Sequence, residues 1–149
     1  TADNYVYNCV TQAQAANLSR NMYSDSNFES DLMNSYAWDT AITFLQKFDN
    51  RADKTKPYSK QKSLNTSLEE KGTNKLSTQD KICNIYDMAS NTYEWTTETY
   101  SSTNNHCVKR GGYYNDSTYS CTSCRNFNYS TNGSGGSSGS ISFRPLLYL

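Results

Sequence analysis

Apolar residues recur at helical spacing in two stretches of the first third of the chain. The first stretch runs from residue 11 to about residue 23. Thr11 has the hydroxyl of a typical N-cap, and Ala15, Leu18 and Met22 fall on one face. We expect this face to pack against the rest of the protein. The polar residues 24–34 that follow are rich in turn formers and are predicted to be a loop.

The second helical pattern is the stronger of the two. It begins with Asn34 or Ser35 as its N-cap. The apolar positions that repeat at helical spacing are Ala37, Trp38, Ala41, Ile42, Leu45 and Phe48. A tryptophan on such a face belongs to a core far more often than to a ligand site, so we assign Trp38 to the core.

Alternation of apolar and polar residues predicts strands. Residues 5–10 alternate at the start of the chain, and residues 82–88 mark a return to regular structure. In residues 89–98, Tyr93, Trp95 and Thr97 occupy alternate positions, which is typical of a half-buried strand. Between the second helix and these strands, residues 49–80 are rich in Lys, Ser, Thr and Asn. We interpret them as a long, irregular surface segment whose lysines are solvated.

Two further strands are predicted in the last third of the chain. A polar turn at residues 101–105 leads into a strand at residues 107–110. That strand ends at Gly111 and Gly112, a pair expected where another backbone comes close or φ is positive. Residues 141–147 have the pattern of a buried strand that completes the domain. Two helices followed by short strands and long loops indicate an α+β fold.

Composition narrows the class of protein. The chain has 149 residues, enough for one domain with a core, and 14 basic residues balance 14 acidic ones. This balance indicates no nucleic-acid or anionic-membrane partner. Hydrophobic residues make up only 35%, while Tyr numbers 13, which favours a soluble domain with an aromatic surface. No apolar run is long enough to predict a membrane span.

The start of the chain and its cysteines leave two questions open. The sequence begins without Met and without a signal-peptide pattern, so we expect it to be the C-terminal part of a longer protein. Five cysteines are an odd number. Partial pairing and a reducing compartment are both compatible with that number.

The composition of residues 113–142 sets this segment apart. It contains no Lys, Glu, Gln, Met or Trp, whereas the rest of the chain holds 9 Lys, 5 Glu, 5 Gln, 3 Met and 2 Trp. An asparagine codon AAC that is mutated only at its adenines encodes none of these five residues. It can encode every residue found in the segment. A Gly- and Ser-rich linker is the alternative, but a linker would not be expected to hold so many Tyr residues.

We therefore predict that residues 113–142 form a hypervariable ligand-binding surface. The scaffold would consist of residues 5–110 and 142–149. Tyr supplies contact area at low entropic cost while Ser, Gly and Asn supply hydrogen bonds, and Tyr anchors would dominate the binding energy. The candidate contact residues are Tyr114, Asn115, Asp116, Tyr119, Ser123, Asn126, Asn128 and Tyr129.

Three motifs resemble the formylglycine-generating-enzyme (sulfatase-modifying factor) family. The family pattern N-x-x-D-x-x-G-N-x-x-E-W is similar to residues 84–95, R-G-G to residues 110–112, and G-F-R to residues 142–144. The helix with residues 35–39 lies where the family has its T-E-A-E-W helix. The resemblance implies a C-type-lectin fold, with two helices packed on twisted antiparallel sheets and long irregular loops.

The chain also resembles the variable proteins of diversity-generating retroelements, which carry the same fold in phages and bacteria. In these proteins, adenine-directed mutagenesis rewrites a C-terminal segment. The resemblance implies a non-catalytic protein on a phage tail or a bacterial cell surface. It would bind a protein or glycan receptor as part of a larger assembly.

An oxidoreductase is the alternative. The family's activity depends on two C-terminal cysteines separated by four residues, which act with copper on a substrate cysteine. Here Cys121 and Cys124 are separated by two. Such a pair can also be a redox pair, half a zinc site, a local disulfide, or a product of adenine mutagenesis. The single histidine, His106, is not placed beside the pair, so a closed zinc site is not expected.

Calcium is the one cofactor that the resemblance leaves open. Asp87, Asn91 and Glu94 lie where the family can bind calcium through oxygen ligands. The interpretation that we favour is structural: Asn91 caps a turn, and Glu94 pairs with Arg110 or Arg144. We therefore expect no resident metal.

Overall fold

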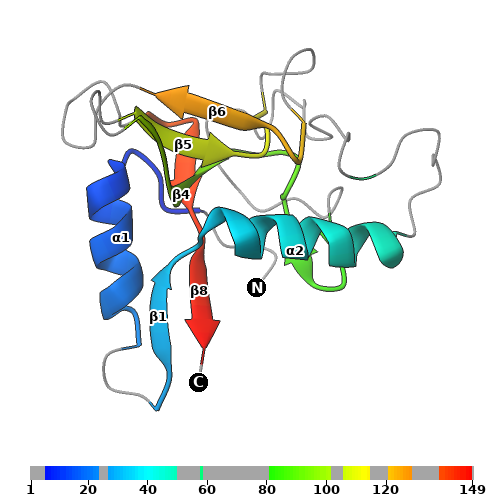
Figure 1. The fold of residues 1–149 in the computed structure, drawn as a ribbon, viewed down its shortest axis with the longest axis horizontal. Helices are drawn as coiled ribbons and strands as arrows, with labels where there is room; N and C mark the ends of the chain where they lie inside the picture. The colour runs from blue at the N-terminus through cyan, green and yellow to red at the C-terminus, as the bar shows by residue number, and fades with distance from the viewer. Residues whose placement is uncertain are drawn as a thin grey trace.

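A four-stranded sheet with the order β6-β5-β4-β7 forms the centre of the protein (Figure 1). The computed structural model describes residues 6–23, 27–49, 58, 81–101, 106–114, 121–128 and 138–148. The strands of this sheet are β4 (Tyr93–Ser101), β5 (His106–Arg110), β6 (Arg125–Asn128) and β7 (Ile141–Phe143). β5 pairs antiparallel with β4 and β6, and β7 runs parallel to β4.

Two small sheets complete the strand arrangement. β1 (Glu29–Leu32) pairs antiparallel with β8 (Pro145–Tyr148), and β2 (Lys81–Ile82) pairs with β3 (Ile85–Tyr86). The prediction of one loop at residues 24–34 is therefore wrong for β1. The predicted final strand is two strands in different sheets, separated by Arg144. With the helices, these sheets confirm the mixed α+β class.

The first helix, α1 (Gln12–Asn21), begins as predicted but buries a different face. Thr11 Oγ1 accepts a hydrogen bond from the Gln14 amide at 3.2 Å, and Gln14 Oε1 accepts one from the Thr11 amide at 2.9 Å. The buried residues are Gln12, Ala15 and Ser19. The predicted apolar face is confirmed at Ala15 and is wrong at Leu18 and Met22, which are exposed. Instead, the side-chain amide of Gln12 (Nε2) donates hydrogen bonds to the backbone carbonyls of Thr96 and Glu98 in β4.

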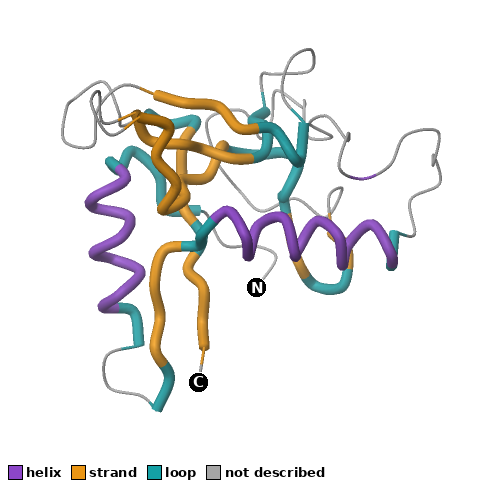
Figure 2. Tube along the Cα trace, in the orientation of Figure 1, coloured by secondary structure: helices purple, strands orange, loops and turns teal. Residues whose placement is uncertain are grey.

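The second helix, α2 (Ser35–Lys47), confirms its prediction except at Phe48, which is the C-cap residue and is half exposed. Asn34 Oδ1 accepts from the Ala37 amide at 2.8 Å, which caps the helix. Trp38, Ile42 and Leu45 are buried at helical spacing. Figure 2 shows α2 crossing the molecule in a different direction from α1, which lies beside β1 and β8.

Residues 6–10 form no strand, contrary to the prediction. Their backbone makes isolated contacts instead of a ladder. Cys9 has a φ of 58° and its amide donates to Ser138 O at 3.2 Å. The carbonyl of Val10 accepts from Trp95 Nε1 at 2.8 Å. The segment therefore ties the start of the chain to the central sheet through single bonds.

Strand β4 is more buried than predicted. Its residues Tyr93 to Thr96 are buried on both faces, because α1, α2 and β1 contact β4 in addition to its sheet partners β5 and β7. Thr97, predicted to alternate with them on the buried side, is exposed. Of the predicted turn at residues 101–105, Ser101 is the last residue of β4, and residues 102–105 lie outside the described residues.

Two apolar clusters form the core. The first, at α1 and the central sheet, contains Val10, Ala15, Leu32, Tyr93, Trp95, Cys107 and Ile141. The second, under α2, contains Met33, Trp38, Ile42, Leu45, Tyr58, Ile82 and Met88. Tyr58 belongs to the predicted surface segment 49–80, so that prediction is wrong at this position. Apart from Asp49 and Tyr58, the segment lies outside the described residues.

Candidate functional site

Strand β6 brings part of segment 113–142 into the central sheet. Arg125 is paired with Arg110 of β5, and Asn126 is paired with Lys109. Directly opposed residues share a face, so Arg125 and Asn126 belong to opposite surfaces of the sheet edge. The predicted scaffold of residues 5–110 and 142–149 is therefore incomplete, because β6 also takes part in the fold.

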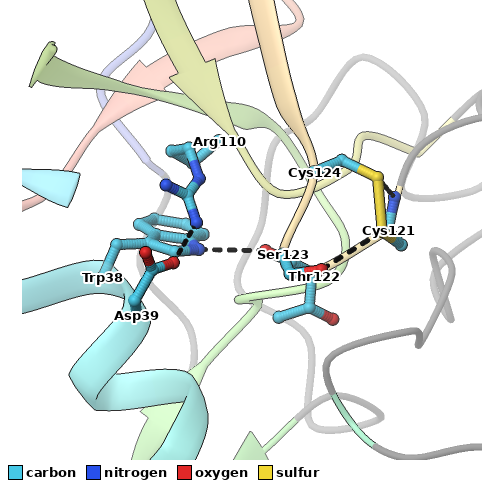
Figure 3. The surroundings of a disulfide bond; sticks show 7 residues. All are labelled: Trp38, Asp39, Arg110, Cys121, Thr122, Ser123 and Cys124. Carbon is cyan, nitrogen blue, oxygen red and sulfur yellow. Dashed lines mark hydrogen bonds and ion pairs between the residues drawn. A yellow bond between two sulfur atoms is a disulfide. The ribbon is translucent and has the colours of Figure 1, made fainter. Parts of the chain in front are cut away.

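The turn that precedes β6 is closed by a disulfide and anchored on α2 (Figure 3). Cys121 and Cys124 are bonded, and the Cys124 amide donates to Cys121 O at 2.8 Å. Thr122 between them is fully buried, and its carbonyl accepts from Trp38 Nε1 at 2.9 Å. Of the possibilities open for this cysteine pair, the structure shows the local disulfide.

Two arginines and two carboxylates join α2 to the sheet beside this turn. Arg110 is fully buried; it contacts Asp39 and lies 3.8 Å from Glu98. Arg125 Nη2 lies 2.9 Å from Asp39, and its Nε lies 3.2 Å from Glu98. Sequence reasoning missed this network, because Asp39 and Glu98 belong to a helix and a strand far apart in the chain. Its only signal was Arg110 in the R-G-G motif.

The pKa values of the two arginines are shifted in opposite directions. Burial lowers the pKa of Arg110 and outweighs the hydrogen bond and charge of Asp39. For Arg125, burial also lowers the pKa, but the neighbouring Glu98 and Asp39 raise it more, and its pKa lies above the usual value. Arg110 is thus the fully buried cation of the network, and Arg125 is the half-exposed one.

The predicted contact residues divide between two surfaces. Tyr114 lies 5.5 Å from Tyr113 in an edge-to-face ring contact, and its amide donates to Asn91 O at 3.0 Å. Ser123 lies in the disulfide turn, on the side of α2. Asn126 is on the sheet face of Lys109, and Asn128 ends β6. The other predicted contacts, Asn115, Asp116, Tyr119 and Tyr129, lie outside the described residues.

An aromatic stack marks the sheet face that carries Asn126. Lys109 Nζ lies 4.3 Å from the centroid of the Tyr93 ring, and the rings of Tyr93 and Tyr113 are 4.8 Å apart. Asn126 is opposite Lys109, so the stack and Asn126 are neighbours on one surface. The structure therefore places Asn126 near the stack of Tyr113 and Tyr114, and Ser123 elsewhere.

The opposite sheet face carries an exposed residue that the sequence prediction did not include. Phe127 alternates with Asn126 along β6 and is 56% exposed. The sequence feature that could have identified Phe127 is its position as an aromatic residue within segment 113–142. A cavity of about 270 Å³ lies on this side of the protein, where Arg125 meets the start of α2. Its lining residues are Asn34, Ser35, Tyr36, Thr97, Glu98 and Arg125.

Residues 10–147 match the family of the sulfatase-modifying factor enzyme 1-like domain. The chain belongs to this family. A search of curated proteins gives no match. Similar solved structures include PvdO from Pseudomonas aeruginosa, with 16% identity and a TM-score of 0.63, and CarF, with 16% identity and a TM-score of 0.62. The alignments cover 93% and 94% of this chain but only 60% of PvdO and 66% of CarF. At this identity the likeness concerns the fold.

In this sulfatase-modifying-factor-like domain, the three motifs contact one another or the core. Glu94 of the first motif and Arg144 of the third form a two-pronged ion pair, at 2.7 and 2.9 Å. Gly111 of the second motif lies against the Met88 carbonyl and the Trp38 ring. These contacts explain why the motifs identify the fold: they hold the two cores and the sheet together.

The residues considered for metals are engaged in other contacts. Both carboxylate oxygens of Glu94 accept from Arg144, and Asn91 Nδ2 donates to Asp87 Oδ2 at 3.0 Å. Glu94 thus pairs with an arginine, as we favoured, and that arginine is Arg144. Sulfurs in a disulfide offer no thiolate to copper. Within the described residues, no cluster of three or more His, Cys, Asp or Glu side chains could hold a metal ion.

Proposed function

We propose that this domain binds a receptor through residues 113–142, that this segment is diversified by adenine-directed mutagenesis, and that the domain catalyses no reaction. The observation that carries the proposal is the complete lack of Lys, Glu, Gln, Met and Trp in the segment. The described part of the segment is compatible with a binding role. Arg125 and Phe127 are exposed on an edge strand, and Tyr114 and Asn126 are partly exposed.

Segment 113–142 is held to the rest of the fold through bonds to its backbone, which supports tolerance of side-chain substitutions. Trp38 donates to the backbone carbonyl of Thr122, and β6 is held to β5 by backbone pairing. Such bonds persist when side chains change, except that the buried side chains of Thr122, Ile141 and Ser142 limit the size of their replacements. The fold can therefore present different side chains on the same backbone.

The remaining parts of the proposal concern fold, location and partners. We infer that the α+β arrangement is a C-type-lectin fold. The domain would be displayed on a phage tail or a bacterial cell surface within a larger assembly, bind a protein or glycan receptor, and use no resident metal. Display in several copies would turn modest single-site affinity into avidity. In the described residues, no helix is both long and apolar enough to cross a membrane.

An oxidoreductase that uses Cys121 and Cys124 is the alternative that we do not favour. The spacing of this pair differs from that of the family's catalytic cysteines. The disulfide also has a structural use, because it closes the turn whose buried Thr122 bonds Trp38. Neither observation favours catalysis.

Diversification is tested by sequencing the 3′ end of this gene in sibling isolates and searching nearby for a near-identical non-coding copy. We expect differences confined to codons 113–142, at positions where the copy has adenine. An invariant segment that always retains Cys121 and Cys124 would contradict the proposal and favour the enzyme.

Receptor binding is tested with Tyr119→Ala and Tyr129→Ala, measured on host cells. We expect both variants to lose at least about tenfold in affinity, because Tyr residues are typical hot spots. Their melting temperatures should stay near that of the parent. Phe48→Ala, which changes an exposed aromatic residue at the C-cap of α2, serves as the control. Unfolding of both Tyr variants would show that these residues belong to the core.

A further inference from the structure

The cavity at the start of α2 combines scaffold residues with one residue of segment 113–142. Five of its lining residues come from the α2 cap and first turn and from β4, and the sixth is Arg125 of β6. Its volume of about 270 Å³ is below the range of roughly 300–1,000 Å³ that drug-sized ligands occupy. The cavity therefore fits one small chemical group, such as a single sugar ring or an amino-acid side chain.

Its polar lining retains free hydrogen-bonding groups of both kinds. Asn34 uses its carbonyl oxygen to cap α2, which leaves its amide as a donor. Arg125 uses Nε and Nη2 for Glu98 and Asp39, which leaves Nη1 as a donor. Ser35 and Arg125 both bond Oε2 of Glu98, which leaves Oε1 as an acceptor. Among the described residues, no hydrogen bond engages these three remaining groups.

The charges around the cavity favour a neutral ligand. Asp39 and Glu98 balance Arg110 and Arg125 in one network. An anion would compete with both carboxylates for Arg125, and a cation would compete with both arginines. A neutral group with several hydroxyls can use the free donors and acceptor without disrupting an ion pair.

Tyr36 supplies the apolar part of the cavity. Its side chain is 88% exposed, so the ring is available to a ligand and contributes little to the core. An aromatic ring beside groups that donate and accept hydrogen bonds suits a sugar, which has an apolar ring face and a polar hydroxyl rim. An apolar amino-acid side chain would use the ring but leave the donors and the acceptor unpaired.

We propose that this cavity is a subsite for one neutral hexopyranose of a receptor glycan. This inference rests on the proposed receptor-binding function and specifies its ligand class. Tyr36 would stack on the sugar ring. Asn34, Glu98 and Arg125 would bond its hydroxyls. Because five of the six lining residues precede segment 113–142, the sugar contact would persist while the segment varies.

The test is a titration of the ¹⁵N-labelled 149-residue chain with glucose, galactose, mannose and N-acetylglucosamine, followed by NMR. We expect at least one sugar to give saturable shifts at the amides of Tyr36, Thr97 and Arg125. Tyr36→Ala should weaken binding about tenfold or more, and Tyr36→Phe should keep it within about twofold, because only the phenyl ring is needed. Phe48→Ala should bind like the parent.

Two results would overturn the subsite. One is the lack of saturable shifts at these three amides with all four sugars. The other is a saturable response there to a Leu- and Trp-containing peptide but not to the sugars, which would assign the cavity to a protein side chain. These outcomes are distinct from failure of the proposed function. Sugar binding with an invariant gene segment would remove diversification and keep the subsite.

Discussion

Gly111 shows how a single residue fixes the approach of three elements. It has a φ of +78°, a conformation that favours glycine. A Cβ atom at this position would lie 2.8 Å from the carbonyl oxygen of Met88 and 3.3 Å from the ring of Trp38. Neither the backbone conformation nor the available space accepts a side chain. At Gly111 the structure thus confirms the prediction that the glycine pair lies where φ is positive or another backbone comes close.

Gly111→Ala is expected to destabilise the domain by about 2–4 kcal/mol, from the strained φ and the overpacked contact together. Urea unfolding measures this difference. The matched control is Gly139→Ala, because an added Cβ at Gly139 meets nothing within 4 Å. The control should lie within about 0.5 kcal/mol of the parent. Equal effects of the two substitutions would refute this explanation for Gly111.

At the scale of elements, helix caps and helical spacing in the sequence predicted both helices. The sequence did not predict features that depend on contacts between distant segments. Thr11 and Asn34 predicted both helix starts because capping depends on neighbouring residues. The buried face of α1 was missed because Gln12 is buried by hydrogen bonds to β4 and not by apolar character. β1 was missed because its partner, β8, is at the other end of the chain.

The candidate site was predicted only in part, for the same reason. Composition predicted a binding surface in segment 113–142, which stays a prediction, and the structure places Tyr114 and Asn126 on one surface with Lys109. The cavity was not predicted, because no pattern in the sequence relates Tyr36 to Arg125. A site assembled from a helix start and two strands becomes visible only when their pairing is known.

The Arg110–Asp39–Arg125–Glu98 network allows a comparison of two cations that join the same elements. Arg110→Ala is expected to cost about 2–4 kcal/mol, because it removes a fully buried cation and leaves a cavity. Arg125→Ala should cost about 0–1 kcal/mol, since Arg125 is half exposed and its ion pairs are screened. Urea unfolding of both variants measures the difference. A larger effect at Arg125 would mean that β6 depends on this side chain, contrary to a diversified segment.

At the scale of the whole molecule, the sheet order places β4 and β5 in the interior of the central sheet and β6 at its edge. β4 is flanked by β5 and β7, whereas β6 has one strand partner among the described residues. Hydrogen–deuterium exchange should therefore find the slowest amides in β4 and β5 and faster exchange in β6. Comparable protection in β4 and β6 would show that β6 opens only with the whole domain. Such a result would argue against an edge that accepts varied sequences.

The position of β7 and β8 in the chain has a consequence for synthesis. β7 begins at the last two residues of segment 113–142 and β8 follows the segment, and each pairs with a strand made earlier, β7 with β4 and β8 with β1. A ribosome must therefore translate the whole segment in frame before the fold can close. Mutation of AAC at its adenines creates no stop codon, so each substituted variant would still receive both strands. A frameshifted product would lack them, expose core residues such as Leu32 and Trp95, and become a substrate for proteolysis.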